Sequence, residues 1–134
     1  MHTRRLMDWI EEATGCMMYK VEAIVREEQL EDIKSALHDI GVNGVTLYQV
    51  MGFGAQRGYS TWVRGQQVDV MMVPKIKLEI VVSSLEWKEK TIRKIQEVAR
   101  TGEVGDGKIF AYEITDAVRI RTGETNYDAL QDDE

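Results

Sequence analysis

A glycine-rich run near the carboxyl end of the chain combines two features that a phosphate site needs. Residues 101–108 read TGEVGDGK, so that Gly102, Gly105 and Gly107 precede Lys108. Glycine lets backbone amides approach a ligand closely, and successive amides in such a turn form an anion-binding concavity. Lys108 adds a point charge for a phosphate. The alternative is a helix-to-strand connection with an Asp-Gly turn. The run is not a Walker P-loop, because its spacing differs and no strand precedes it.

Two arginines follow closely, in the sequence Arg119-Ile120-Arg121. On a strand such residues point to the same side, where two guanidinium groups repel each other unless an anion joins them. Guanidinium groups suit bidentate contacts to phosphate. The alternative is a pair of solvated arginines at a sheet edge. With residues 105–108 on the neighbouring strand, the phosphate interpretation is favoured.

A third group of residues combines Gly52–Gly58, read as GFGAQRG, with Lys75 further along the chain. Backbone amides, the neutral carbonyl of Gln56 and the cation of Lys75 together suit a small carboxylate beside a metal ion. The alternative is a flexible loop followed by a lysine that begins a strand.

The spacing of apolar residues predicts the elements that position these groups. Strands are expected over residues 17–26, 44–52, 75–82 and 108–114, and helices over residues 27–41 and 83–100. Ser83 and Glu86 resemble a capping box at the start of the second helix. The order strand, helix, strand, strand, helix, strand predicts an α+β, ferredoxin-like βαββαβ sandwich with both helices on one face of the sheet. The other face is left uncovered, which predicts oligomerisation.

Three segments fall outside this pattern. Residues 53–73 form an unusually long, polar, glycine-punctuated connection, which is typical of a functional loop. Residues 1–16 are expected to be an N-terminal appendage to a domain over residues 17–134. The end of the chain is acidic and is expected to be loose.

Composition limits the class of protein. The chain of 134 residues is long enough for one core, and its net charge of -6 with a pI of about 5.0 argues against a general nucleic-acid binder. One cysteine, Cys16, permits no intrachain disulfide, and no apolar run is long enough to span a bilayer. We therefore expect a cytoplasmic protein. Two histidines and one cysteine make no metal cluster.

Several motifs together resemble one family. VNGVT, GFGAQRG, PKIKLEIVV, TGEVGDGKIF and VRIRTGE occur in collinear order from about Met18 to Leu130. In this order they are similar to the PII nitrogen-regulatory signal-transduction proteins, with only the N-terminal appendage outside the match.

The resemblance implies a homotrimer that binds ATP or ADP, Mg²⁺ and 2-oxoglutarate in clefts between subunits, and that regulates a partner through the T-loop, residues 53–73. It implies nucleotide contacts from Ile24, Gly44, Val45, Thr46, Gly54, Gln56, Val81, Gly105, Asp106, Gly107, Lys108, Arg119 and Arg121, the two arginines reaching in from an adjacent subunit. It implies 2-oxoglutarate contacts from Gln56, Arg57, Gly58 and Lys75, Mg²⁺ coordination by Gln56, and partner contacts from Trp62, Arg64 and Gly65. The implied partner is an ammonium channel, another transporter or a metabolic enzyme of nitrogen metabolism.

Two alternatives to a 2-oxoglutarate sensor stay open. One is a divergent PII-like adenine-nucleotide sensor without a 2-oxoglutarate response. Gln56 and Lys75 argue against it, whereas Ala55, where many members have an arginine, leaves it open. The other is a small phosphoryl-transfer enzyme, which would need a positioned base or nucleophile. Asp106 is the one candidate base, and it also suits the turn, so the chain is expected not to be an enzyme.

Overall fold

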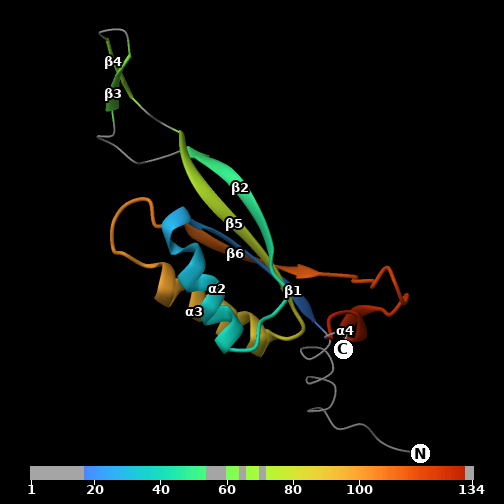
Figure 1. Ribbon diagram of the computed structural model, residues 1–134. Helices are drawn as coiled ribbons and strands as arrows, with labels where there is room; N and C mark the ends of the chain where they lie inside the picture. The colour runs from blue at the N-terminus through green and yellow to red at the C-terminus, as the bar shows by residue number, and fades with distance from the viewer. Residues whose placement is uncertain (1–16, 54–59, 64–65, 70–71, 132–134) are drawn as a thin grey trace, which may run out of the picture.

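A four-stranded antiparallel sheet, covered on one face by two helices, forms the centre of the computed structural model (Figure 1). The structure describes residues 17–53, 60–63, 66–69 and 72–131. Its elements are β1 (Met18–Arg26), the short helix η1 (Glu27–Gln29), α2 (Leu30–Asp39), β2 (Thr46–Phe53), β3 (Ser60–Val63), β4 (Gln66–Asp69), β5 (Met72–Val82), α3 (Leu85–Ala99), β6 (Lys108–Ile114) and α4 (Asn126–Ala129). The strand order β2-β5-β1-β6, with α2 and α3 as connections, confirms the predicted ferredoxin-like arrangement.

The core lies between the sheet and the two long helices. Alternate residues of the two central strands point into it, as their period-two pattern predicts. The alternate residues of this pattern are at most 7% exposed: Tyr19, Val21, Ala23 and Val25 in β1, and Ile76, Leu78, Ile80 and Val82 in β5. From the helices, Ile33, Leu37 and Ile95 complete the core with 0–1% exposure. Burial of each such large aliphatic side chain stabilises the fold by about 1.5–3 kcal/mol.

Helix α2 ends where the sequence places a glycine. Gly41 has φ of +96°, which favours glycine, and its N–H donates to the carbonyl of His38 over 3.0 Å. The N–H of Val42 donates to the carbonyl of Leu37 over 2.9 Å, so the last helical carbonyls are satisfied. The tip of Trp87 lies 3.3 Å from the position that a Cβ on Gly41 would take, so a side chain there would press on α3.

The predicted capping box of α3 is displaced by one residue. Ser84, rather than Ser83, is the N-cap, and its hydroxyl accepts a hydrogen bond from the N–H of Trp87 over 3.1 Å. Glu86 is therefore the second residue of the helix and cannot complete a box with Ser83. Consecutive serines make the correct cap ambiguous in the sequence.

Replacing Ser84 by alanine is expected to lower the free energy of unfolding by about 1 kcal/mol, because the N–H of Trp87 loses its partner. Urea unfolding followed by circular dichroism measures this loss. Ser83→Ala is the matched control and should change stability by less than about 0.5 kcal/mol. A larger loss in the Ser83 variant would contradict the assigned cap.

The face of the sheet opposite the helices carries an ion-pair network rather than an apolar surface. Lys20 pairs with Glu79 at 3.1 Å, and Lys77 pairs with Glu22 at 3.2 Å and with Glu79 at 3.4 Å. The hydroxyl of Tyr112 donates to Glu22 over 3.0 Å. The prediction of an uncovered face is correct, but its centre is charged, with exposed aromatic side chains on the outer strands, namely Tyr48, Phe110 and Tyr112.

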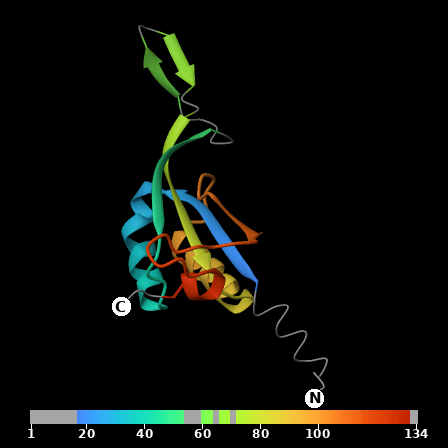
Figure 2. The same ribbon diagram turned by 90° about the vertical axis from the view of Figure 1, so that its right-hand side faces the viewer.

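Two segments depart from their expected conformations. Strands β2 and β5 pair as far as Phe53 and Met72, beyond the helices, and so enter the range 53–73 that was expected to be a loop (Figure 2). The segment after β6 is not a strand: an isolated bridge joins Val118 to Thr125, and the N–H of Gly123 donates to the carbonyl of Arg119 over 2.8 Å. The expected loose end instead contains the short helix α4.

Candidate functional site

The glycine-rich connection between α3 and β6, residues 101–107, is folded around the carboxylate of Asp106; we call it the phosphate loop. This carboxylate accepts hydrogen bonds from the N–H of Thr101 over 2.8 Å, from the N–H of Gly102 over 2.9 Å and from the Thr101 hydroxyl. These hydrogen bonds hold the pKa of Asp106 well below its usual range. The Thr101 hydroxyl has the largest effect, and the two amides and Arg26 lower the pKa further. The carboxylate thus stays ionised in the fold until the pH falls below that range, and its stabilising contribution is lost only there.

Two cations lie at the base of the phosphate loop. Arg26, the last residue of β1, forms a 3.1 Å ion pair with Asp106 through Nε and donates from Nη2 to the carbonyl of Val104 over 2.8 Å. Lys75, opposite Arg26 in the register of β1 and β5, donates to the carbonyl of Gly105. Two successive loop carbonyls are therefore directed toward cations from the central strands.

Gly107 fits its position because it has no side chain. Its φ is +102°, and a Cβ there would lie 1.7 Å from the carbonyl oxygen of Ile24. Real Cβ atoms do not approach backbone this closely, so β1 and the phosphate loop can pack together only around glycine. This contact fixes the loop against the strand that carries Arg26.

Lys75 is the most buried cation among the described residues, with 6% exposure. Burial lowers its pKa, and the neighbouring charge of Arg26 lowers it further. A lysine in this setting gains from an anionic partner. That it receives a carboxylate stays a prediction; in this structure its ammonium group donates to the Gly105 carbonyl.

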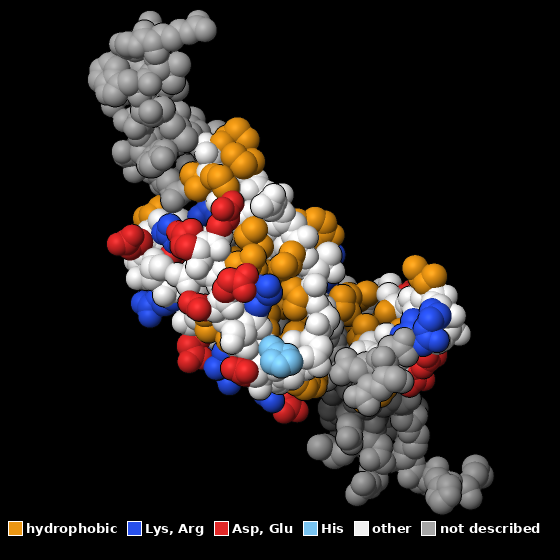
Figure 3. All heavy atoms as spheres, in the orientation of Figure 1, with side chains coloured by type: hydrophobic (Ala, Val, Ile, Leu, Met, Phe, Trp, Pro, Cys, Tyr) orange, Lys and Arg blue, Asp and Glu red, His pale blue; other side chains and the backbone are white. Residues whose placement is uncertain are grey.

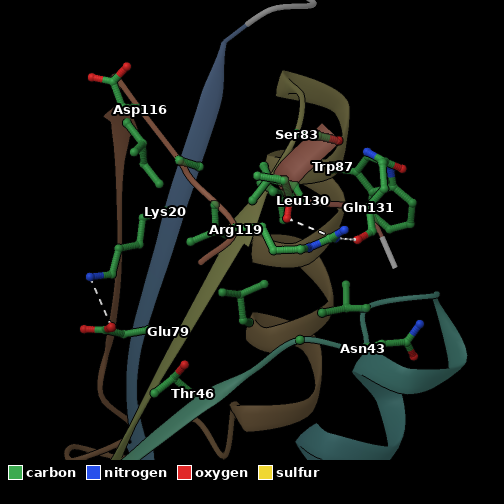
Figure 4. Close-up of a pocket in the computed structure, with 18 of the residues that line it drawn as sticks. Lys20, Asn43, Thr46, Glu79, Ser83, Trp87, Asp116, Arg119, Leu130 and Gln131 are labelled. Atoms are coloured by element: carbon green, nitrogen blue, oxygen red, sulfur yellow. Dashed lines mark hydrogen bonds and ion pairs between the residues drawn. The ribbon is translucent and has the colours of Figure 1, made fainter. Parts of the chain in front are cut away.

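A second group of the predicted nucleotide residues lines a hollow of about 1040 Å³ at the other end of the sheet (Figure 4). Gly44 reaches it from just before β2, Thr46 from the start of β2, Val81 from the end of β5, and Arg119 from the segment after β6. Val45, between Gly44 and Thr46, is half-buried against the core.

Arg119 is held within the C-terminal segment. It pairs with Glu124 at 3.0 Å and donates to the carbonyl of Ala129 over 3.3 Å and to the carbonyl of Gln131. Figure 4 shows its side chain directed toward Leu130 and Gln131. Arg121 lies in the exposed turn of this segment. These contacts attach the segment that carries Arg119 and Arg121 to residues 124–131.

The two groups of residues are separate within one chain. Ile24, Asp106, Gly107 and Lys108 line a smaller hollow of about 440 Å³, which shares no lining residue with the larger one. The phosphate loop precedes β6 and the arginines follow it, so they lie at opposite ends of that strand (Figure 1). The sequence-based expectation that Arg119 and Arg121 lie on a strand beside residues 105–108 is therefore wrong for a single chain.

Some predicted site residues lie outside the described residues: Gly54, Gln56, Arg57, Gly58, Arg64 and Gly65. Trp62 belongs to β3, and only its backbone is described. Conversely, the sequence analysis did not single out Arg26, and it gave no role to the hydroxyl of Thr101. The sequence did contain a signal for Arg26. It ends the first predicted strand and Lys75 begins the third, so antiparallel pairing of these strands places the two cations opposite each other.

Most of the chain is similar to known proteins of one family. The family model described as "Nitrogen regulatory protein P-II" matches residues 18–124. The chain belongs to the P-II family. Among curated PII relatives, the protein of Rhodospirillum rubrum is 45% identical over 84% of this chain and 100% of its own length. P-II 1 of Methanothermobacter thermautotrophicus is 50% identical over 84% of this chain and 97% of its own length.

Solved PII structures also resemble this chain. Arabidopsis thaliana PII bound to citrate is 41% identical, with a TM-score of 0.69 over 87% of this chain and 93% of that chain. The B. subtilis GlnK–ATP complex is 36% identical, with a TM-score of 0.69 over 86% of this chain and 99% of that chain. PII proteins are signal-transduction regulators rather than enzymes, and trimers are typical of them.

Proposed function

We propose that this PII protein is a trimeric sensor that binds ATP or ADP in clefts formed by two neighbouring copies. The observation that carries the proposal is the division of the predicted nucleotide residues into two groups at opposite ends of β6. One copy would supply the phosphate loop with Lys108, and its neighbour would supply Thr46, Val81 and the arginines. A closed trimer repeats this pairing at each interface.

The chemistry of each half suits a different part of a nucleotide. The phosphate loop offers backbone amides, and Lys108 directly after it is an exposed cation. Both suit phosphate oxygens. The neighbour's β2 and β5 ends offer a hydroxyl from Thr46 and apolar surface from Val81, which suit a ribose and a base. Arg119 and Arg121 would then meet the phosphates across the interface, where the anion offsets the repulsion among the cations.

A carboxylate effector is the finer part of the proposal. Magnesium, when bound, would neutralise phosphate charge, and Gln56 would help to hold it together with the phosphates. Lys75 would receive the carboxylate by exchanging its contact with the Gly105 carbonyl for that ligand. The citrate-bound Arabidopsis relative supports a carboxylate ligand in the family, and we propose 2-oxoglutarate for this chain.

Calorimetric titration with ATP, ADP and 2-oxoglutarate, separately and together, tests the proposed function. We expect both nucleotides to bind, and 2-oxoglutarate to bind only in the presence of Mg-ATP. Lys75 alone cannot offset a dianion beside nucleotide phosphates, whereas a shared divalent cation can. Binding of 2-oxoglutarate to the ADP complex at similar affinity would refute the effector mechanism, and the lack of any nucleotide binding would refute the sensor.

A sensor that responds to adenine nucleotide without 2-oxoglutarate is the second candidate. The contact of Lys75 with the Gly105 carbonyl favours it, because a carboxylate must displace that contact. In the same titration, this candidate predicts nucleotide binding that 2-oxoglutarate does not change under any condition.

We propose that the range 53–73 carries the partner contacts, with Trp62, Arg64 and Gly65 among them. Two exposed methionines lie at the ends of this range: Met51 just before it, at 55% exposure, and Met72 within its last residues, at 54%. Figure 3 shows hydrophobic side chains gathered at this end of the molecule. Exposed methionine is typical of adaptable contact surfaces. A transporter or a metabolic enzyme is the proposed partner, and a cytoplasmic location with membrane association through a transporter is proposed with it. Within the described ranges, no helix has the length and apolar character needed to cross a membrane.

A further inference from the structure

We propose that Arg26 is a positioning residue that sets the nucleotide affinity of the phosphate loop without touching the ligand. This inference rests on the proposed nucleotide function. It assigns to Arg26 the task of keeping the loop amides directed outward through Asp106 and Val104.

Arg26 holds the phosphate loop at two points, and we call this pair of contacts, to Asp106 and Val104, the clamp. Its guanidinium group contacts two points of the phosphate loop at once, the Asp106 carboxylate at 3.1 Å and the Val104 carbonyl at 2.8 Å. Its side chain is 18% exposed and that of Asp106 is 23% exposed, so water competes little for the pair. Such a two-point contact uses the planar fork of arginine and restricts both partners.

Peptide geometry connects this clamp to ligand binding. In a trans peptide, the carbonyl and the following N–H point in opposite directions. Because Arg26 holds the Val104 carbonyl inward, the N–H of Gly105 points away from Arg26. The contact of Lys75 with the Gly105 carbonyl does the same for the N–H of Asp106. Successive outward amides of this kind form an anion-binding concavity.

The Asp106 contact extends the clamp to the start of the loop. The same carboxylate that pairs with Arg26 also accepts from the N–H groups of Thr101 and Gly102. Loss of Arg26 would leave a mostly buried carboxylate without its charged partner and free Val104 to turn. The amides would then sample more orientations, and phosphate binding would have to order them again.

Hydrogen exchange and ADP titration of Arg26→Gln test the role directly. In the ligand-free protein we expect the amides of Thr101 and Gly102 to exchange about tenfold faster, because local opening becomes easier. We expect ADP affinity to fall about tenfold. Arg26→Lys, which keeps one charged donor for Asp106, should recover most of both losses. Lys34→Gln, which removes an exposed α2 cation paired with Glu31, is the matched control and should change neither.

A double-mutant cycle separates positioning from direct contact. If Arg26 acts through Asp106, Arg26→Gln combined with Asp106→Asn binds ADP no more weakly than the weaker single variant. Additive losses, or unchanged loop exchange in Arg26→Gln, would overturn the proposal. If the wild-type protein binds no ADP, the proposed function fails, and the exchange of Thr101 and Gly102 alone decides whether Arg26 holds the loop.

Discussion

Gly107→Ala is expected to abolish measurable nucleotide binding and to cost at least about 3 kcal/mol of folding stability. The new Cβ would lie 1.7 Å from the carbonyl oxygen of Ile24, so the phosphate loop and β1 must separate. An alanine also disfavours the φ of +102° that the loop needs. Separation would move the loop away from the end of β1 and so break the contacts of Arg26. Urea unfolding and calorimetric titration with ADP measure both effects.

Gly102→Ala is the matched control for this change. Its φ of +92° is similar, but no atom lies within 4 Å of the position that its Cβ would take. We therefore expect only the backbone cost, about 1–2 kcal/mol, with nucleotide binding largely kept. Wild-type stability and binding in Gly107→Ala would show that the loop is not held against β1 as described.

Lys108→Ala and Arg121→Ala are each expected to weaken ATP and ADP binding about tenfold to a hundredfold, because a charge-assisted phosphate contact contributes ~1.5–3 kcal/mol. Both residues are exposed, so the melting temperature should change little. Lys34→Ala and Arg93→Ala, which remove exposed cations from the outer surface of α2 and α3, are the matched controls. Unchanged titration curves for both site variants would reject the phosphate assignment.

The fold could be predicted from the sequence because the apolar residues of its two central strands, β1 and β5, alternate with more exposed residues. Val21, Ala23 and Val25 in β1 and Leu78 and Ile80 in β5 are buried as their spacing requires. Because apolar residues recur at every second position, only one face of each strand can pack against the helices. The glycine at position 41 likewise marked the end of α2, because its positive φ disfavours other residues.

The functional groups were harder to place. Val118 and Ile120 alternate with the two arginines as they would on a strand. The segment turns instead of extending, because Glu124 and the carbonyl of Gln131 supply Arg119 with partners. Arg26 was missed because its partner Asp106 is distant in sequence. The residue pattern of a single chain also does not indicate which end of β6 would contact a neighbouring copy in a trimer. The division of the site became clear only from the three-dimensional placement of its residues.

Mixed trimers of Lys108→Ala and Arg121→Ala test most directly the central claim that two chains build each nucleotide site. Equal amounts of the two variants are unfolded in urea, refolded together and titrated with ADP. Because each cleft takes its phosphate loop from one copy and its arginines from the next, about a quarter of the clefts in random trimers regain both groups. The account predicts wild-type affinity in that fraction, with none in either pure variant. A mixture that shows only weakened sites would contradict it.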